Sequence, residues 1–278
     1  MCDHVAVTPH MDDAVPSTAL LSRVYPASLT DTAKPVIELI SSDERMPASD
    51  VQGYLATGRS ALRAVRLAQF AAGVGDFTSI LDLPSGHGRV LRWLKAAYPD
   101  ARLTASDLLT EGVDFCAETF GAAAVHSVPS PTADIFGGKF DLIWVGSLFT
   151  HLDVAQWNHF IELFDELLLP NGIAVVSTHG ELVAERMRQG NLYGYPELSV
   201  QRALRTYSHA GFTFLEEAPS SIEYGITIST PAWVVDRFLR RPNFRLVMFT
   251  EALWANHQDV IAVMKLQVDS RYAEQPVL

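Results

Sequence analysis

The chain has 278 residues, 48% of them apolar, so it can bury a substantial core and has the length of one domain with additions. Its formal net charge of -11 argues against a nucleic-acid partner, because phosphates are bound mainly by clustered Lys and Arg. The two cysteines, Cys2 and Cys116, are too few for a disulfide framework or a cysteine-rich zinc site, so we expect no metal.

The apolar runs are short throughout. None approaches the ~20 residues that a membrane helix needs, and no basic and apolar leader opens the chain. We therefore expect a cytoplasmic protein that acts on a small molecule, without nucleic-acid or membrane partners. The oligomeric state stays open, a homodimer included.

The first part of the chain lacks a sustained hydrophobic period. Residues 1–48 contain five prolines among scattered Ser and Thr, which predicts an irregular N-terminal arm. Apolar residues at helical spacing predict a helix over residues 60–72, closed by Gly73. We assign residues 49–268 to the main domain and 269–278 to a C-terminal tail.

From residue 79 onward, strand and helix patterns alternate. Between the strands lie amphipathic segments of helical period, one of which begins at Asp153 and Gln156 with the pattern of a capping box. This alternation predicts right-handed crossovers and a mostly parallel, doubly wound α/β sheet. The predicted strands are residues 79–83, 102–106, 123–126, 140–145 and 173–177.

After the fifth predicted strand the pattern changes. Residues 181–230 contain two helical segments and two short strands, which indicates an inserted cap of about that length. A helix over residues 231–240 then leads to strands at 244–249 and 260–266. Too few residues join these last two strands for a helical crossover, so we expect them to pair antiparallel.

The segment ILDLPSGHGRV, residues 80–90, joins the first strand to a helix through a glycine-rich loop. In an open α/β sheet, ligands bind beyond the carboxyl ends of the strands. Gly86 and Gly88 lack a Cβ and let a ligand approach the backbone, whereas Pro84 has a fixed φ and no donor. Asp107 ends the second strand, where a carboxylate can accept both hydroxyls of a ribose.

Two cofactors compete for such a loop. A dinucleotide fingerprint requires Gly or Ala three positions after its second glycine, and this chain has Leu91 there. The antiparallel pair at the end of the sheet also disfavours a dinucleotide enzyme.

The motifs YLATGRSAL, ILDLPSGHGRV, ASDL, FDLIWVGSLFTHL, LLLPNGIAVVSTHG and NHQDVIAV occur in this order over residues 50–268. In order and spacing the chain resembles a class I S-adenosylmethionine-dependent methyltransferase of the small-molecule type. The resemblance implies a Rossmann-like, seven-stranded sheet of order 3-2-1-4-5-7-6, with strand 7 antiparallel. In this chain, the predicted cap is inserted between strand 5 and the following helix.

The resemblance also implies where S-adenosyl-L-methionine binds. The first loop lies under the methionine part, with Asp82 at its amino group, and Asp107 holds the ribose with Leu108 against the adenine. Tyr54 and Arg59 are candidates to close over the cofactor's carboxylate, with a solvated helix face as the alternative. Two departures are Pro84, where the family usually has glycine, and the absence of an acidic residue near Ser127. The predicted cofactor-binding residues are Tyr54, Arg59, Asp82, Pro84, Ser85, Gly86, Gly88, Asp107, Leu108, Ser127, Gly146, Ser147 and Leu148.

Histidines are the candidates for a catalytic base, since imidazole titrates near working pH. His151 follows the fourth strand and His179 the fifth, both at the ligand edge of the sheet. Packing at a helix start is the alternative for His151. We expect the His87 ring to point to solvent and His257 to be structural.

Aromatic residues of the cap and its exit, Tyr193, Tyr195, Tyr224 and Trp233, are candidate substrate contacts, with packing as the alternative. We therefore predict methyl transfer from S-adenosylmethionine to an O, N or C atom of a small molecule. The alternatives are an NAD(P)-dependent oxidoreductase and a cofactor-binding protein without transferase activity.

Overall fold

The computed structural model describes residues 29–46, 50–216 and 225–267. Its main sheet has seven strands in the order β3-β2-β1-β4-β5-β9-β8. Strands β1 to β5 pair in parallel, and β9 pairs antiparallel with both β5 and β8. In chain order within the sheet this is 3-2-1-4-5-7-6, so the predicted fold class is confirmed.

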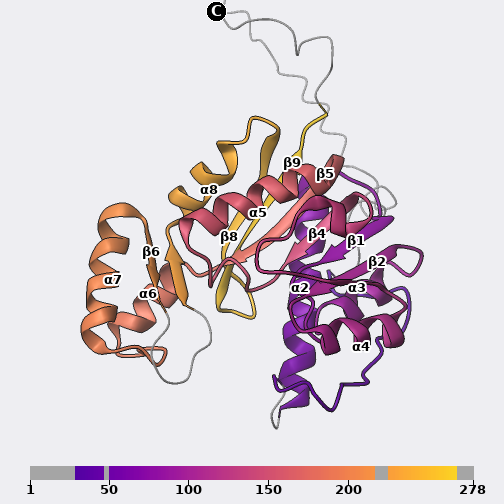
Figure 1. Cartoon of the computed structure of the whole chain (residues 1–278), viewed down its shortest axis with the longest axis horizontal. Coiled ribbons are helices and arrows are strands. Elements are labelled where there is room, and N and C mark those ends of the chain that lie inside the picture. The colour runs from indigo at the N-terminus through magenta and orange to yellow at the C-terminus, as the bar shows by residue number, and fades with distance from the viewer. Residues whose placement is uncertain (1–28, 47–49, 217–224, 268–278) are drawn as a thin grey trace, which may run out of the picture.

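The elements carry the labels of Figure 1. The helices are α2 (Val51–Ala72), α3 (Leu91–Ala97), α4 (Thr110–Phe120), α5 (Val154–Leu167), α6 (Glu181–Arg188), α7 (Glu197–Ala210) and α8 (Pro231–Leu239), with a 3-10 turn η1 (Ala133–Phe136). The strands are β1 (Ser79–Asp82), β2 (Arg102–Asp107), β3 (Ala123–His126), β4 (Phe140–Val145), β5 (Leu168–Thr178), β6 (Phe212–Leu215), β7 (Ile226–Ser229), β8 (Phe244–Trp254) and β9 (Gln258–Lys265).

Most predicted elements appear with shifted ends. Helix α2 begins at Val51, well before the predicted start, because Asp50 caps it by accepting from the Gly53 amide. Strand β8 continues to Trp254 instead of ending near residue 249. The capping box of Asp153 and Gln156 at the start of α5 is confirmed.

Two apolar layers enclose the sheet. One cluster joins α2, α3 and α4 to one face, and the other joins α5 and α8 to the opposite face. Each strand therefore sends alternate side chains into different layers, as in Ile80 and Leu81 of β1. This two-sided burial explains why the strands read as continuous apolar runs in the sequence.

The inserted segment has its own apolar cluster, built from α6, α7, β6 and β7. Strands β6 and β7 form a separate antiparallel pair. Figure 1 shows these elements at one end of the molecule, away from α2, α3 and α4. We call the segment of residues 181–230 the cap, of which residues 217–224 lie outside the described part.

The described part of the N-terminal arm, residues 29–46, packs against α2 and α3, and we call it the strap. It is irregular, as predicted. Its Lys34 amide donates to the Ala96 carbonyl, and Arg92 of α3 donates to the carbonyls of Ile37 and Leu39. The Arg92 side chain is buried between the rings of Tyr54 and Phe120. Arg92 thus contacts the strap, α2 and α4 and holds them together.

No helix in residues 29–46, 50–216 or 225–267 is long and apolar enough to cross a membrane. The division of the chain into arm, main domain and tail stays a proposal, since both ends lie outside the described ranges.

Gly58 of α2 lies against the loop that follows β1. A Cβ there would lie 2.1 Å from the Arg89 carbonyl oxygen and 2.6 Å from Cδ1 of Trp93. Overpacking costs ~1–3 kcal/mol, which outweighs the ~1 kcal/mol that alanine gains over glycine inside a helix. We therefore expect Gly58→Ala to lower the free energy of unfolding by about 1–2 kcal/mol in urea denaturation.

Gly75→Ala is the matched control, because no described atom lies within 4 Å of the Cβ it would add. It should leave the free energy of unfolding within about 0.5 kcal/mol of the wild type, as is usual for surface substitutions. A Gly58→Ala protein as stable as the Gly75→Ala protein would contradict the close contact between α2 and the loop.

Candidate functional site

The loop after β1 is tied to the end of β2. The Ser85 amide donates to the Ser106 carbonyl. The Asp107 carboxylate accepts from the Gly86 amide at 2.7 Å and from the Leu109 amide at 3.0 Å. Asp107 therefore points toward the loop, and its carboxylate is fixed at the edge of the sheet where α/β folds bind ligands.

The two glycines of the loop have different roles. Gly86 has φ of +49°, and no described atom lies within 4 Å of where its Cβ would be, so it presents bare backbone. Gly88 has φ of +74°, but a Cβ there would lie 2.4 Å from the Phe120 ring and 3.0 Å from Cys116 Sγ. The missing side chain of Gly88 thus allows close packing of α4, whereas the Cβ side of Gly86 is open.

Asp82, the last residue of β1, is almost fully buried. Neither of its carboxylate oxygens has a hydrogen bond of normal geometry within the described residues. Burial raises the pKa of this carboxyl well above its usual range; the Asp107 charge adds to this, and Arg89 opposes it. A buried carboxyl without a partner is costly, so this position calls for a ligand that brings a hydrogen-bond donor or a positive charge.

Arg89, which sequence analysis did not single out, is the complementary group. Its guanidinium lies over the rings of Tyr54 and Trp254, at 5.9 and 5.5 Å from their centroids. In the described part of the chain it has no hydrogen bond or ion pair, although it interacts electrostatically with Asp82. Burial lowers its pKa, yet the group stays charged, as arginine does in proteins. The two rings thus position the Arg89 guanidinium, which can bind an anionic group of a ligand.

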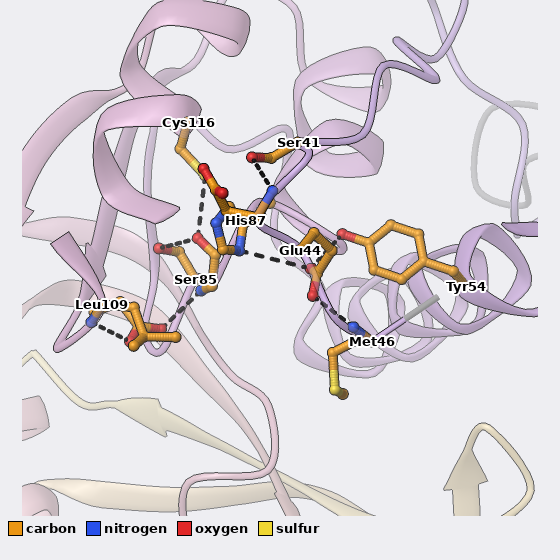
Figure 2. A network of polar contacts seen from close by, with 12 residues as sticks. Ser41, Glu44, Met46, Tyr54, Ser85, His87, Leu109 and Cys116 are labelled. Atoms are coloured by element: carbon orange, nitrogen blue, oxygen red, sulfur yellow. Dashed lines mark hydrogen bonds and ion pairs between the residues drawn. The ribbon is translucent and has the colours of Figure 1, made fainter. Parts of the chain in front are cut away.

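The strap contributes Glu44 to this region (Figure 2). The Glu44 carboxylate accepts from the Tyr54 hydroxyl at 2.9 Å and from the Met46 amide at 2.9 Å. It lies 3.9 Å from Nδ1 of His87, and both side chains are nearly inaccessible to solvent. The expectation that His87 points to solvent was wrong, because the strap covers this side of the loop.

The strap also changes the interpretation of Tyr54 and Arg59. Tyr54 is buried beside the loop with its hydroxyl engaged by Glu44. Burial, with the Glu44 charge, raises the Tyr54 pKa. Arg59 is exposed on the opposite side of α2 and donates to the Thr30 hydroxyl. The structure therefore brings Tyr54, but not Arg59, to the predicted methionine end, and Arg89 supplies the cation there.

The remaining predicted nucleotide contacts lie at the ends of β2 and β3. The side chain of Leu108 is 47% exposed beside Asp107, and that of Val128 is 51% exposed. The Ser127 amide donates to the Asp107 carbonyl, so Ser127 is at the same edge. Exposed apolar side chains next to a ribose-binding carboxylate are suited to the faces of an adenine ring.

The end of β4 is fixed by a closed set of hydrogen bonds. The Ser147 amide donates to Ser177 Oγ, which donates to the side-chain oxygen of Gln258, whose amide group donates back to Ser147 Oγ. Ser147 has φ of +62°, a strained value for a residue with a side chain. Gly146 has no room for a side chain, because Trp144 and Trp254 lie within 2.9 Å of where its Cβ would be.

Comparisons with known proteins agree with this geometry. Residues 80–172 match the sequence model of a family described as a methyltransferase domain. They contain the loop, Asp107 and the end of β4. Residues 80–172 therefore carry a methyltransferase domain, within a sheet that has the predicted strand order. The match favours the predicted cofactor, S-adenosylmethionine, over the predicted alternative of a nicotinamide-dependent oxidoreductase.

Solved structures share the fold of the methyltransferase domain. An O-methyltransferase family protein from Burkholderia thailandensis is 12% identical with a TM-score of 0.48, over 84% of this chain and 66% of that one. PKMT2 from Rickettsia typhi is 13% identical with a TM-score of 0.50, over 78% and 54%. This chain therefore spans about two thirds or less of these two proteins. No curated protein matches the sequence significantly.

The residues of the methyltransferase domain fit the amino-acid end of S-adenosylmethionine. The ligand carries an ammonium and a carboxylate, and the site carries the unpartnered carboxyl of Asp82 and the unpaired guanidinium of Arg89. Gly86 leaves the backbone open beside them. Pro84 and Ser85, also predicted as contacts, belong to the same loop, Pro84 half-buried and Ser85 buried.

The two candidate catalytic histidines of the domain differ in their surroundings. Nδ1 of His151 lies 2.7 Å from the Gly225 carbonyl, which can only accept, so Nδ1 carries the proton and Nε2 the lone pair. Burial lowers the His151 pKa. His179 is buried, and burial with the charges of His257 and His151 lowers its pKa to about 3. Of the two side chains, His151 is half-buried and His179 is buried.

The predicted substrate contacts also differ in their surroundings. Tyr193 lies near His257, with a ring-centroid distance of 6.4 Å, and has φ of +50°. Tyr195 is packed inside the cap, and Trp233 stacks on Phe212. The geometry of Tyr195 and Trp233 therefore favours packing, which is the alternative to a substrate contact. Tyr224 lies outside the described residues.

Within the described ranges, no group of three or more His, Cys, Asp or Glu side chains could hold a metal ion. Leu148, the last predicted cofactor contact, is half-buried against the apolar layer of α5.

The arrangement of Arg89 predicts a loss of binding that is specific to the amino-acid tail. In Arg89→Met, S-adenosylhomocysteine should bind about 30-fold or more weaker by calorimetry, because a charge-assisted hydrogen bond of ~1.5–3 kcal/mol is lost in a buried site. 5′-Methylthioadenosine lacks the tail, so its affinity should change less than about twofold.

Arg59→Met is the matched control, since Arg59 points away from the loop, and it should alter neither affinity. An Arg89→Met protein that weakens both ligands equally would show that Arg89 only shapes the loop.

Proposed function

We propose that the protein transfers a methyl group from S-adenosylmethionine to a nucleophilic O, N or C atom of a small-molecule acceptor. The observation that carries this proposal is the buried Asp82 carboxyl without a hydrogen-bond partner in the described residues, with the half-buried Arg89 guanidinium and the bare backbone of Gly86 beside it. This arrangement matches a zwitterionic amino-acid tail. Asp107 is then placed for the ribose, and Leu108 with Val128 for the adenine.

When bound, the cofactor supplies a methyl carbon already activated by its sulfonium. The protein therefore has to align the acceptor and exclude water, and effective alignment can contribute ~7–11 kcal/mol to lowering the barrier. The rigid set of Ser147, Ser177 and Gln258 fixes the end of β4, where the methyl is expected. The cap covers the side from which the acceptor approaches.

His151 is the proposed general base for acceptors that lose a proton. The Gly225 carbonyl fixes its tautomer, so that the unprotonated Nε2 is the nitrogen that can accept. This corresponds to the usual arrangement of a base held by a second group. His179, also predicted as catalytic, is kept neutral by burial and is proposed to shape the acceptor side without taking a proton.

The acidic composition supports a small acceptor over a nucleic acid. A cytoplasmic location is part of the same proposal, and the oligomeric state stays open. The alternatives are an NAD(P)-dependent oxidoreductase, which cofactor binding separates from a methyltransferase, and a protein that binds S-adenosylmethionine without transferring its methyl group, which turnover separates from an enzyme.

The direct test of the proposal combines binding and turnover. The wild-type protein should bind S-adenosylmethionine and S-adenosylhomocysteine by calorimetry but not NADH, and should methylate at least one member of a panel of phenols, alcohols, amines and carboxylic acids. Asp107→Ala should weaken S-adenosylhomocysteine about 100-fold, because two hydrogen bonds to a charged group are lost. Unchanged affinity in Asp107→Ala would refute the assignment of the site.

The base proposed at His151 predicts a distinct pH profile. Because burial lowers its pKa below the usual 6.5, kcat should rise with pH through a value under 6.5 and then stay level. His151→Gln should lower kcat about 100-fold or more and should remove the rise of kcat with pH. The affinity for the cofactor should be unchanged. His159→Gln is the control. His159 lies on α5 and its Nε2 is hydrogen-bonded to the Pro131 carbonyl, so this substitution should leave the pH profile unchanged.

A further inference from the structure

His257 lies in the turn between β8 and β9, so it is carried by the main sheet and not by the cap. Its ring lies 5.2 Å from that of His179 and 6.4 Å from that of Tyr193, between centroids. The next residue, Gln258, donates to Ser147 at the end of β4. The His257 ring is therefore one residue away from the set of side chains that fixes the place of methyl transfer.

The tautomer of His257 is fixed by Arg186 of the cap. Nη1 of Arg186 lies 2.6 Å from Nδ1 of His257. A guanidinium can only donate, so Nδ1 must accept, and the ring proton of neutral His257 is on Nε2. Burial and the adjacent Arg186 charge both lower the His257 pKa, which keeps the ring neutral.

Nε2 of His257 is available to a ligand. The side chain is half-buried, and in the described part of the chain this nitrogen has no hydrogen-bond partner. Around it, two buried polar atoms also lack partners within the described residues, Nδ1 of His179 and the hydroxyl of Tyr193. Unpartnered buried groups of this kind are uncommon and indicate a place where water or a ligand supplies the missing partner.

The charges around His257 indicate what kind of ligand this is. Arg186 is bound to His257, and Arg188 is bound to Glu181 and Glu185. Asp259, nearby on β9, adds a carboxyl, and burial raises its pKa to about 6. Arg186 keeps its positive charge, but it lies on the Nδ1 side of the ring, so a ligand at Nε2 meets a neutral N–H donor. The ligand group facing His257 should therefore be neutral and should accept a hydrogen bond.

We propose that His257 is a specificity-determining residue, whose Nε2–H donates to a neutral oxygen of the acceptor beside the atom that is methylated, and that Arg186 is its positioning residue. The acceptors are then small neutral molecules in which a hydroxyl, ether or carbonyl oxygen is adjacent to the nucleophile, such as vicinal diols or catechols. This inference rests on the proposed function and specifies its acceptor.

The first test needs no substrate. In protein with 15N-labelled histidines, the His257 ring, assigned with His257→Gln, should show a protonated Nε2 and an unprotonated Nδ1 at neutral pH and should titrate below the usual histidine pKa. Arg186→Met should raise the His257 pKa and mix the two tautomers, whereas Arg186→Lys, which keeps a donor, should preserve the wild-type state. A wild-type ring that titrates with the usual histidine pKa, or one that is indifferent to Arg186→Met, overturns the inference.

The second test uses acceptor pairs that differ by one oxygen, catechol with phenol and 1,2-cyclohexanediol with cyclohexanol. The wild-type protein should prefer the member with the additional oxygen by about fivefold to tenfold in kcat/KM, which is the value of one neutral hydrogen bond. His257→Leu should abolish this preference mainly through KM, and His257→Gln, which retains a donor, should restore part of it. Equal losses on both members of a pair overturn the inference.

The two proposals can fail separately. If the proposed function is wrong, S-adenosylhomocysteine fails to bind or no acceptor is methylated. If this inference is wrong, methyl transfer proceeds without regard to the adjacent oxygen. Binding of catechol to the complex with S-adenosylhomocysteine, followed at the His257 Nε2 signal, tests the contact without turnover, and an unmoved signal at saturating catechol overturns it.

Discussion

The burial of one guanidinium organises the cofactor side of the molecule. Arg92 is 1% exposed, so its N–H groups need protein acceptors, and they find them at the carbonyls of Ile37, Leu39 and Gly88. Its flat faces meet the rings of Tyr54 and Phe120. Satisfying this single cation requires the strap, the glycine loop and two helices to meet in one arrangement, and Arg89 and Glu44 take their places as a result.

The general arrangement of the cofactor site could be predicted from the sequence because it follows from local patterns. Alternating strands and helices fix which loops meet at the carboxyl edge of the sheet, so the strand order alone predicts that the loop of Gly86 lies beside the carboxylate of Asp107. The antiparallel end of the sheet followed from the short connection after β8. The same reasoning could not distinguish Gly86 from Gly88, since only the packing of Phe120 shows that Gly88 faces a helix.

What could not be predicted depends on contacts between distant segments. Glu44 lies in an irregular arm without a sequence period, and nothing local indicates that it covers His87. Arg89 looks like a solvated residue at a helix start until Trp254, from the far end of the chain, is seen beside it. Trp233 looked like a pocket residue because its helix follows the cap, whereas its ring fills a gap against Phe212.

The position of His257 on the hairpin of β8 and β9 has a consequence for engineering the protein. If the cap were exchanged for that of another enzyme, the histidine would stay behind with the sheet, while the arginine that sets its tautomer would leave with the cap. Such a chimaera would keep His257, but no arginine would fix which ring nitrogen carries its proton. Such grafts should carry over a donor at position 186, or the hairpin should be transplanted together with the cap.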